Sequence, residues 1–113
     1  MLHDMKLNPE PFSLIKSGKK RYELRLYDEK RRALTLGDEI RFTNTATGKM
    51  LTVTVIGLHV YKSFTELYDA LPHSEIGYTD DDISTASPLD MEKYYSPVEI
   101  EKYGVVAIEI KPQ

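Results

Sequence analysis

The sequence contains no cysteine, so neither a disulfide framework nor a thiolate metal cluster can hold the fold or carry its chemistry. No apolar stretch approaches the ~20 residues that span a bilayer, and the first residues form no apolar signal core. These absences favour a reducing compartment. We therefore expect a cytoplasmic protein with no membrane partner.

The signatures of several common catalytic sites are also missing. The chain has no Gly-x-Ser-x-Gly elbow and no glycine loop of the kind that cradles phosphates, so acyl-enzyme and NTPase mechanisms lack support. The histidines, His3, His59 and His73, lie far apart without the close pairing typical of zinc ligands. We expect no metal site and no cofactor.

The chain carries little net charge. A formal charge of −3 over 113 residues argues against a general nucleic-acid binder, because duplex affinity depends largely on neutralising phosphates. The charges are nevertheless segregated, with eight basic and three acidic residues in 16–32 but ten acidic residues and one lysine in 66–101. The two segments either form a bipolar surface with one face suited to phosphate or neutralise each other in the fold.

Length and composition indicate one ordinary domain over residues 1–113. In its first half, Pro9 begins a short helix, and Gly18, which tolerates positive φ, ends it. Residues 39–43 and 49–60 have the β-branched, alternating pattern of a hairpin, in which Gly57 marks a bulge or bend.

Serine caps mark the second half of the chain. Helices should begin after Ser63, Ser87 and Ser96, and Glu66 should reach back to the amide of Ser63 in a capping box. The apolar run 105–110 predicts a strand in the interior of the sheet. This order of elements favours an α+β fold, a mixed β-barrel with short helices packed outside.

The segment 18–26 carries the most informative chemistry. Alternation along a predicted strand at 20–27 separates an apolar face, with Tyr22 pointing inward, from a polar face. On the polar side a cation could hold a phosphate while a carboxylate accepts hydrogen bonds from a base edge. The alternative is a solvated face whose ion pairs contribute little. The candidate ligand-binding residues are Lys20, Arg21, Glu23 and Arg25, although Lys20 and Glu23 differ in strand parity and need a bulge or twist to meet.

This segment resembles the signature of a known family. The matching features are Gly18-x-Lys20-x-x-Glu23-x-Arg25, Pro11-Phe12, Gly37-Asp38 and Ile40-x-Phe42, which are similar to the motifs of ASCH domains. The resemblance covers residues 5–60 and the closing strand, but not 74–103. It implies a PUA-like β-barrel with a cleft beside the motif strand, and RNA or a modified nucleoside as the ligand of Lys20, Glu23 and Arg25.

One branch of that family comprises small bacterial amidohydrolases that deacetylate N(4)-acetylcytidine with a lysine, a threonine and a glutamate. Lys20 matches the lysine, Glu23 replaces the threonine, and the glutamate would fall near Glu75. Because Glu23 supplies no hydroxyl, a hydrolase would have to use it as a general base, with Lys20 or Arg25 stabilising the oxyanion. A ribonuclease using Glu23 and Arg25 and an interaction protein using the acidic helices near Asp90 to Glu101 are further alternatives.

Aromatic and acidic residues outside the motif leave two more alternatives open. The tyrosines that could stack on bases are Tyr22, Tyr27, Tyr61 and Tyr78, although most should lie in the core or at its rim. The acidic run 80–82 is expected to form a mobile loop, with a lid over the basic face as the alternative reading.

Overall fold

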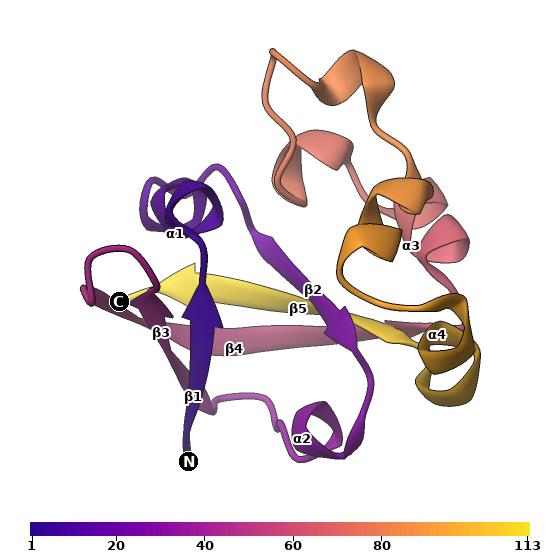
Figure 1. Cartoon of the computed structure of the whole chain (residues 1–113). Helices are drawn as coiled ribbons and strands as arrows, with labels where there is room; N and C mark the ends of the chain where they lie inside the picture. The colour runs from indigo at the N-terminus through magenta and orange to yellow at the C-terminus, as the bar shows by residue number, and fades with distance from the viewer.

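The computed structural model describes all residues from 1 to 113 as a curled five-stranded sheet, a half-barrel with short helices around it (Figure 1). The strands are β1 (Leu2–Leu7), β2 (Tyr22–Leu26), β3 (Glu39–Asn44), β4 (Met50–Tyr61) and β5 (Val105–Pro112), in the spatial order β1-β3-β4-β5-β2. β1 runs parallel to β3, and the other neighbours are antiparallel. The α+β fold predicted from the sequence is confirmed.

The helices are short. They are α1 (Pro9–Lys16), α2 (Glu29–Arg32), α3 (Phe64–Ala70) and α4 (Pro97–Tyr103), with 3₁₀ helices η1 (His73–Glu75), η2 (Ile83–Thr85) and η3 (Pro88–Lys93) between α3 and α4. None of them combines the length and the apolar character needed to cross a membrane.

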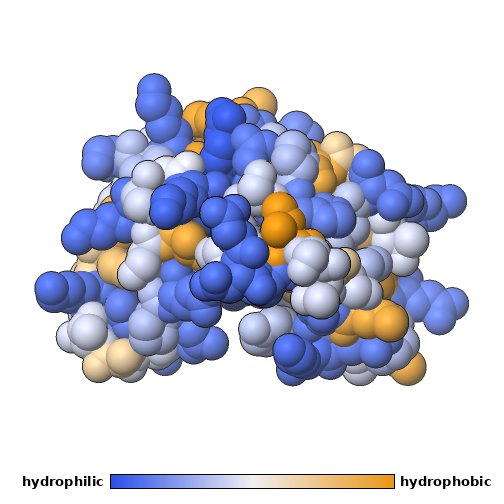
Figure 2. All heavy atoms as spheres, turned by 90° about the horizontal axis from the view of Figure 1, so that it is seen from above, coloured by the Kyte–Doolittle hydropathy of each residue, from blue (hydrophilic) through white to orange (hydrophobic).

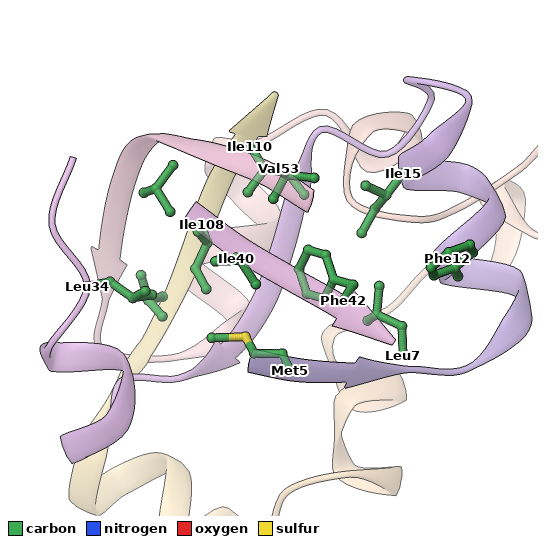
Figure 3. Packing of buried hydrophobic residues seen from close by; sticks show 12 residues of the cluster. Met5, Leu7, Phe12, Ile15, Leu34, Ile40, Phe42, Val53, Ile108 and Ile110 are labelled. Carbon is green, nitrogen blue, oxygen red and sulfur yellow. The ribbon is translucent and has the colours of Figure 1, made fainter. Parts of the chain in front are cut away.

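β5 separates two hydrophobic clusters, because its alternate side chains point to opposite faces of the sheet. Val106, Ile108 and Ile110 belong to the cluster inside the half-barrel, whereas Val105 and Ala107 belong to the one outside it. The other members of the inner cluster, most of which Figure 3 labels, are Met5, Leu7, Phe12, Ile15, Leu34, Ile40, Phe42, Val53 and Val55. Those of the outer cluster are Leu24, Leu26, Phe64, Leu67, Tyr68 and Ile76. The prediction that β5 lies in the sheet interior is confirmed.

The predicted serine caps are present, with one difference. Ser63, Ser87 and Ser96 each accept a hydrogen bond from a backbone amide in the first turn of α3, η3 and α4. Glu66 does not return to Ser63 as expected. Its carboxylate accepts a hydrogen bond from the amide of Lys62 at 3.3 Å and therefore satisfies the residue before the cap.

The glycine predictions in the first half also hold. Gly18 has a φ of 82° just after α1. In β4, Val55 pairs with Ile110 and Gly57 with Glu109, so Ile56 is the extra residue of a β-bulge. The bulge lies where the sequence predicted it.

The half-barrel is open between its edge strands β1 and β2, and two cationic side chains, one from β2 and one from α2, donate to the backbone of β1. Arg25 Nη2 donates to the carbonyl of Lys6, and Lys30 Nζ donates to the carbonyl of Asp4, each at 3.0 Å. Edge strands carry unpaired backbone groups, and these contacts satisfy two of them. Lys30 comes from α2, a single turn that Asp28 caps and that no sequence pattern predicted.

Gly104, which connects α4 to β5, provides a test of the fold. Its φ of 71° and ψ of −172° lie in a region that is essentially restricted to glycine. A Cβ there would lie 3.1 Å from the carbonyl oxygen of Tyr61, which is held by its pairing with Val105. We expect Gly104→Ala to lower the free energy of unfolding by about 2 kcal/mol, as measured by urea denaturation.

The control is Gly48→Ala in the β3–β4 turn. Gly48 also has a positive φ, 74°, but nothing lies within 4 Å of the position that a Cβ would occupy. A smaller loss of stability is expected there. Equal losses at the two positions would contradict the role assigned to the contact with Tyr61.

Candidate functional site

The polar face of β2 points into the half-barrel. Glu23 pairs with Ile108 and Arg25 with Val106, and both partners belong to the inner cluster. Since directly opposed residues of an antiparallel pair share a face, Glu23 and Arg25 point toward the barrel interior. Glu23 is only 4% exposed. The alternative of a solvated strand face is therefore wrong.

Both carboxylate oxygens of Glu23 contact a cation. Lys20 Nζ lies 2.9 Å from Oε1. Arg25 places Nη2 at 2.7 Å and Nε at 2.9 Å from Oε2. Lys20 reaches Glu23 in spite of strand parity because residues 20 and 21 precede β2 and lie outside the regular strand.

The three charges stabilise one another. Burial raises the pKa of Glu23, but the charges and hydrogen bonds of Lys20 and Arg25 outweigh burial and hold that pKa below its ordinary value. Burial also lowers the pKa of Arg25, and Glu23 more than reverses this effect. Glu23 is therefore an ionised, weakly basic carboxylate, and the cluster retains one net positive charge.

Lys20, Glu23 and Arg25 line a cleft of about 660 Å³. Its first wall comes from β2, α1 and the end of β1 with the turn that follows it. Its second wall comes from residues 76–95, which stand on the same side of the molecule as α1 in Figure 1. Seen from above, the surface is mostly hydrophilic and is indented between two lobes (Figure 2). The volume lies within the range of about 300–1,000 Å³ typical of small-molecule sites.

The formal charges that line this cleft cancel. Four lining residues are basic and four are acidic, namely Lys6, Lys20, Arg25 and Lys93 against Glu10, Glu23, Asp82 and Asp90. A long-range attraction for polyanions is therefore not built into the cleft itself. Individual donors and acceptors decide what binds there.

Hydrogen bonds hold the second wall together. The Tyr78 hydroxyl donates to Asp90 Oδ2 at 2.6 Å and lies 2.8 Å from the hydroxyl of Tyr68, on α3. Burial, reinforced by Asp90, raises the pKa of Tyr78, so this hydroxyl keeps its proton. Asp90 also accepts from the amide of Ser87. Tyr78 therefore joins η3 to α3.

Two further tyrosines complete the second wall. Tyr95 stacks on Phe64, with ring centroids 6.1 Å apart. Tyr94, which also lines the cleft, is 64% exposed. Nothing in the sequence indicated that either tyrosine would line a cleft, because the only local signals there are the serine caps of the helices on either side. Of the four tyrosines considered from the sequence, Tyr78 alone lines the cleft.

The other sequence-predicted site residues lie elsewhere. Arg21 and Glu75 do not line the cleft and form a pair of their own, with Nη1 3.2 Å from Oε1. Tyr22 packs against the outer cluster, with its ring edge on His59. No group of three or more His, Asp or Glu residues is arranged to hold a metal ion. The structure thus unites Lys20, Glu23 and Arg25 and leaves Arg21 and Glu75 outside.

Comparison with known families decides the identity of the fold. The model of the ASCH domain family matches residues 5–113, including the stretch 74–103 that the sequence resemblance had left uncovered. The chain belongs to the ASCH domain family. ASCH domains have been proposed to bind RNA, and their PUA-like architecture agrees with the curled sheet described above.

Solved structures support this assignment. The crystal structure of hypothetical protein PH0355 is 40% identical, with full coverage of both chains and a TM-score of 0.83. The solution NMR structure of protein PF0455 from Pyrococcus furiosus is 39% identical, with 99% and 97% coverage and a TM-score of 0.73. The ASCH structure from Zymomonas mobilis shares the fold at 19% identity, with a TM-score of 0.65 over 98% of this chain and 69% of that one. No curated protein matches the chain significantly.

The buried carboxylate of this ASCH domain predicts a pH-dependent stability. Glu23→Gln leaves Lys20 and Arg25 without their counter-charge and should lower the free energy of unfolding at pH 7 by about 3 kcal/mol. The pKa of Glu23 is lower in the folded state than its ordinary value of 4.5. The stabilisation of the folded state by ionised Glu23 is therefore complete above pH 4.5 and is lost as the pH falls through the folded-state pKa. The difference in the free energy of unfolding between wild type and Glu23→Gln should therefore become smaller at acidic pH.

Urea denaturation between pH 7 and pH 3 measures this difference. Glu10→Gln is the control, because Glu10 lines the cleft but is exposed and makes no ion pair. It should change stability little at any pH. A Glu23→Gln effect that stays constant across the range would contradict the proposed ionised cluster.

The second wall predicts a local effect for Tyr78→Phe. The variant keeps the ring but removes the bonds to Asp90 and Tyr68, at a cost of about 1–2 kcal/mol. Hydrogen exchange should speed up in residues 76–95 more than in the sheet. Uniform protection in variant and wild type would show that the hydroxyl does not hold this wall.

Proposed function

We propose that this ASCH domain binds RNA by enclosing one unpaired nucleoside, unmodified or modified, in the cleft. The observation that carries the proposal is the buried Glu23, which orients the two cations Lys20 and Arg25 along the wall of a nucleoside-sized cleft. Donors held in place by packing and a shared counter-ion lose little entropy on binding.

Both cations keep donors for a ligand. Lys20 Nζ has three protons and contacts only Glu23. Arg25 uses Nε and Nη2 for Glu23 and Lys6, whereas its Nη1 makes no hydrogen bond within the protein. Such donors match acceptor atoms, which base edges and phosphates both offer. The cationic wall therefore favours a ligand that presents oxygen or ring-nitrogen acceptors.

The opposite wall offers an aromatic surface. Tyr94 is exposed, lines the cleft and makes no hydrogen bond that would have to be broken. Unpaired bases stack on such rings, whereas bases inside a duplex cannot reach them. A base held between Tyr94 and the cationic wall would use both sides of the cleft.

Charge balance argues for an unpaired nucleoside rather than a duplex. Duplex binding depends on many phosphate contacts, and the cleft has as many acidic as basic residues. The net charge of −3 also argues against duplex binding. The cytoplasmic location expected from the sequence would give the domain access to RNA.

Hydrolysis is the alternative function, and the geometry favours it less. A general base needs an available lone pair and a pKa near the working pH. Glu23 has both oxygens engaged by cations and a lowered pKa. Glu75, the third residue expected of a hydrolase, pairs with Arg21 outside the cleft.

Titration calorimetry tests the binding proposal. The probes are the four ribonucleosides, N(4)-acetylcytidine and a single-stranded RNA pentamer, with a duplex of the same sequence as a comparison. Tyr94→Ala should weaken the tightest interaction about tenfold or more, since stacking contributes about 1–3 kcal/mol per base. Tyr94→Phe keeps the ring and should retain affinity. If no nucleoside or single strand binds, or if the duplex binds best, the proposal fails.

A turnover assay separates binding from hydrolysis. Wild type and Lys20→Ala are incubated with N(4)-acetylcytidine and with the RNA pentamer, and products are identified by mass spectrometry. We expect no product from either protein. Product formed by the wild type and lost in a folded Lys20→Ala variant would establish the hydrolase instead.

A further inference from the structure

A second, smaller hollow of about 330 Å³ lies beside the cleft. Three of its lining residues are cations, Lys20, Arg21 and Lys111, and none is acidic. The cleft, in contrast, is lined by equal numbers of positive and negative residues. The two compartments therefore differ in the ligand chemistry that they favour.

Lys20 connects the two compartments, because it lines both. Its neighbour Arg21 is held at both backbone groups, since its amide donates to the carbonyl of Glu75 at 2.8 Å and its carbonyl accepts from the amide of Ile110 at 3.0 Å. Ile56, the extra residue of the β4 bulge, lines the hollow as well. Backbone hydrogen bonds of Arg21 to Glu75 and Ile110 thus hold the hollow in place next to Lys20.

The cations around the hollow are compensated only in part, because Lys20 pairs with Glu23 and Arg21 with Glu75, whereas Lys111 has no carboxylate partner. Arg21 shares its charge with Glu75, and this is the one direct ion pair between the basic segment 16–32 and the acidic segment 66–101. Lys111 is exposed and forms no ion pair, and the same is true of Lys16 and Lys19, which lie near the lining residue Gly18 in the sequence. Clustered cations in a concave surface attract compact anions.

We propose that the hollow binds the phosphate adjoining the nucleoside held in the cleft, so that the ligand is a nucleotide or an RNA strand rather than a free nucleoside. The inference rests on the proposed nucleoside binding in the cleft. Lys20 then stands between base and phosphate, and Arg21 and Lys111 donate to the phosphate oxygens. Arg21, which lies outside the cleft, gains a role in ligand binding.

The test compares ligands that differ only in phosphate. The probes are the tightest-binding of the four ribonucleosides, its 5′- and 3′-monophosphates, the RNA pentamer and inorganic phosphate, each titrated calorimetrically at two salt concentrations. One of the two monophosphates should bind about tenfold more tightly than the nucleoside at low salt. A single charge-assisted hydrogen bond to the phosphate contributes roughly a tenfold gain in affinity. Inorganic phosphate alone should bind much more weakly than the monophosphate.

Variants locate the effect. Lys111→Ala should reduce the ratio of nucleotide to nucleoside affinity, Lys111→Glu should reduce it further, and both should flatten the salt dependence of RNA binding. Lys62→Ala removes an exposed lysine beyond the far end of β4 and should leave the ratio and the salt slope at wild-type values. Lys111 is exposed near the end of β5, so its variants are expected to fold.

The outcomes separate this inference from the proposed function. Nucleosides that bind as tightly as their monophosphates, or a Lys111 effect no larger than that of Lys62, overturn the phosphate site and leave nucleoside binding intact. Tight binding of inorganic phosphate alone overturns the coupling between hollow and cleft. If no nucleoside, nucleotide or RNA binds, the proposed function fails and the inference fails with it.

Discussion

The buried ion cluster of Glu23, Lys20 and Arg25 is the interaction on which the rest of this ASCH domain depends. A carboxylate out of contact with water is strongly destabilising unless charge and hydrogen bonds compensate it, and here each oxygen meets a cation within 3 Å. Arg25 extends the cluster to the carbonyl of Lys6 and so ties β2 to β1 across the open side of the half-barrel. Barrel closure and the shape of the cationic wall are therefore consequences of one arrangement.

The two walls of the cleft have separate structural origins. The cationic wall belongs to the half-barrel, whereas the second wall comes from the long connection between β4 and β5 and is attached through Tyr78, Asp90 and the stacking of Tyr95 on Phe64. Tyr78 bonds to Asp90 and to Tyr68 on α3, whereas Tyr95 stacks on Phe64 and also lies close enough to Arg25 and Glu23 to interact with their charges. Changes in the connection around Tyr78 can thus alter the shape of the cleft, whereas changes at Tyr95 would also affect the charges that the barrel presents.

The sequence predicted the features that depend on local signals. Proline and glycine predicted the ends of α1, the serine caps predicted the starts of α3, η3 and α4, and Gly57 predicted the bulge. Each of these residues affects only the backbone next to it, so its effect can be predicted from the local sequence. The single turn α2 was missed, since four polar residues carry no apolar periodicity. The partner of Glu66 was also wrong, because a flexible carboxylate can reach either of two adjacent amides.

The candidate site was predictable in its members but not in its environment. Alternation correctly separated the two faces of β2, yet it could not indicate that the polar face would be covered by the barrel, because burial depends on β1 and β5, which are distant in sequence. The contact of Lys20 with Glu23 depends on irregular backbone before β2, which periodicity does not describe. Tyr94 and Tyr95 were missed for the same reason, since their position follows from the packing of a long connection.

The charge segregation seen in the sequence also acquires a physical meaning. The basic segment 16–32 and the acidic segment 66–101 form a single ion pair, Arg21 with Glu75. Direct pairing therefore neutralises little of the charge of either segment. At physiological ionic strength, exposed charges separated by more than about 8 Å are largely screened from each other. The net charge of −3 for the whole chain therefore does not determine the electrostatic potential in the hollow. A phosphate in the hollow would lie near Lys20, Arg21 and Lys111, of which only Lys111 has no carboxylate partner. The proposed recognition of one nucleotide and its phosphate, instead of a long duplex, is therefore compatible with a mildly acidic protein.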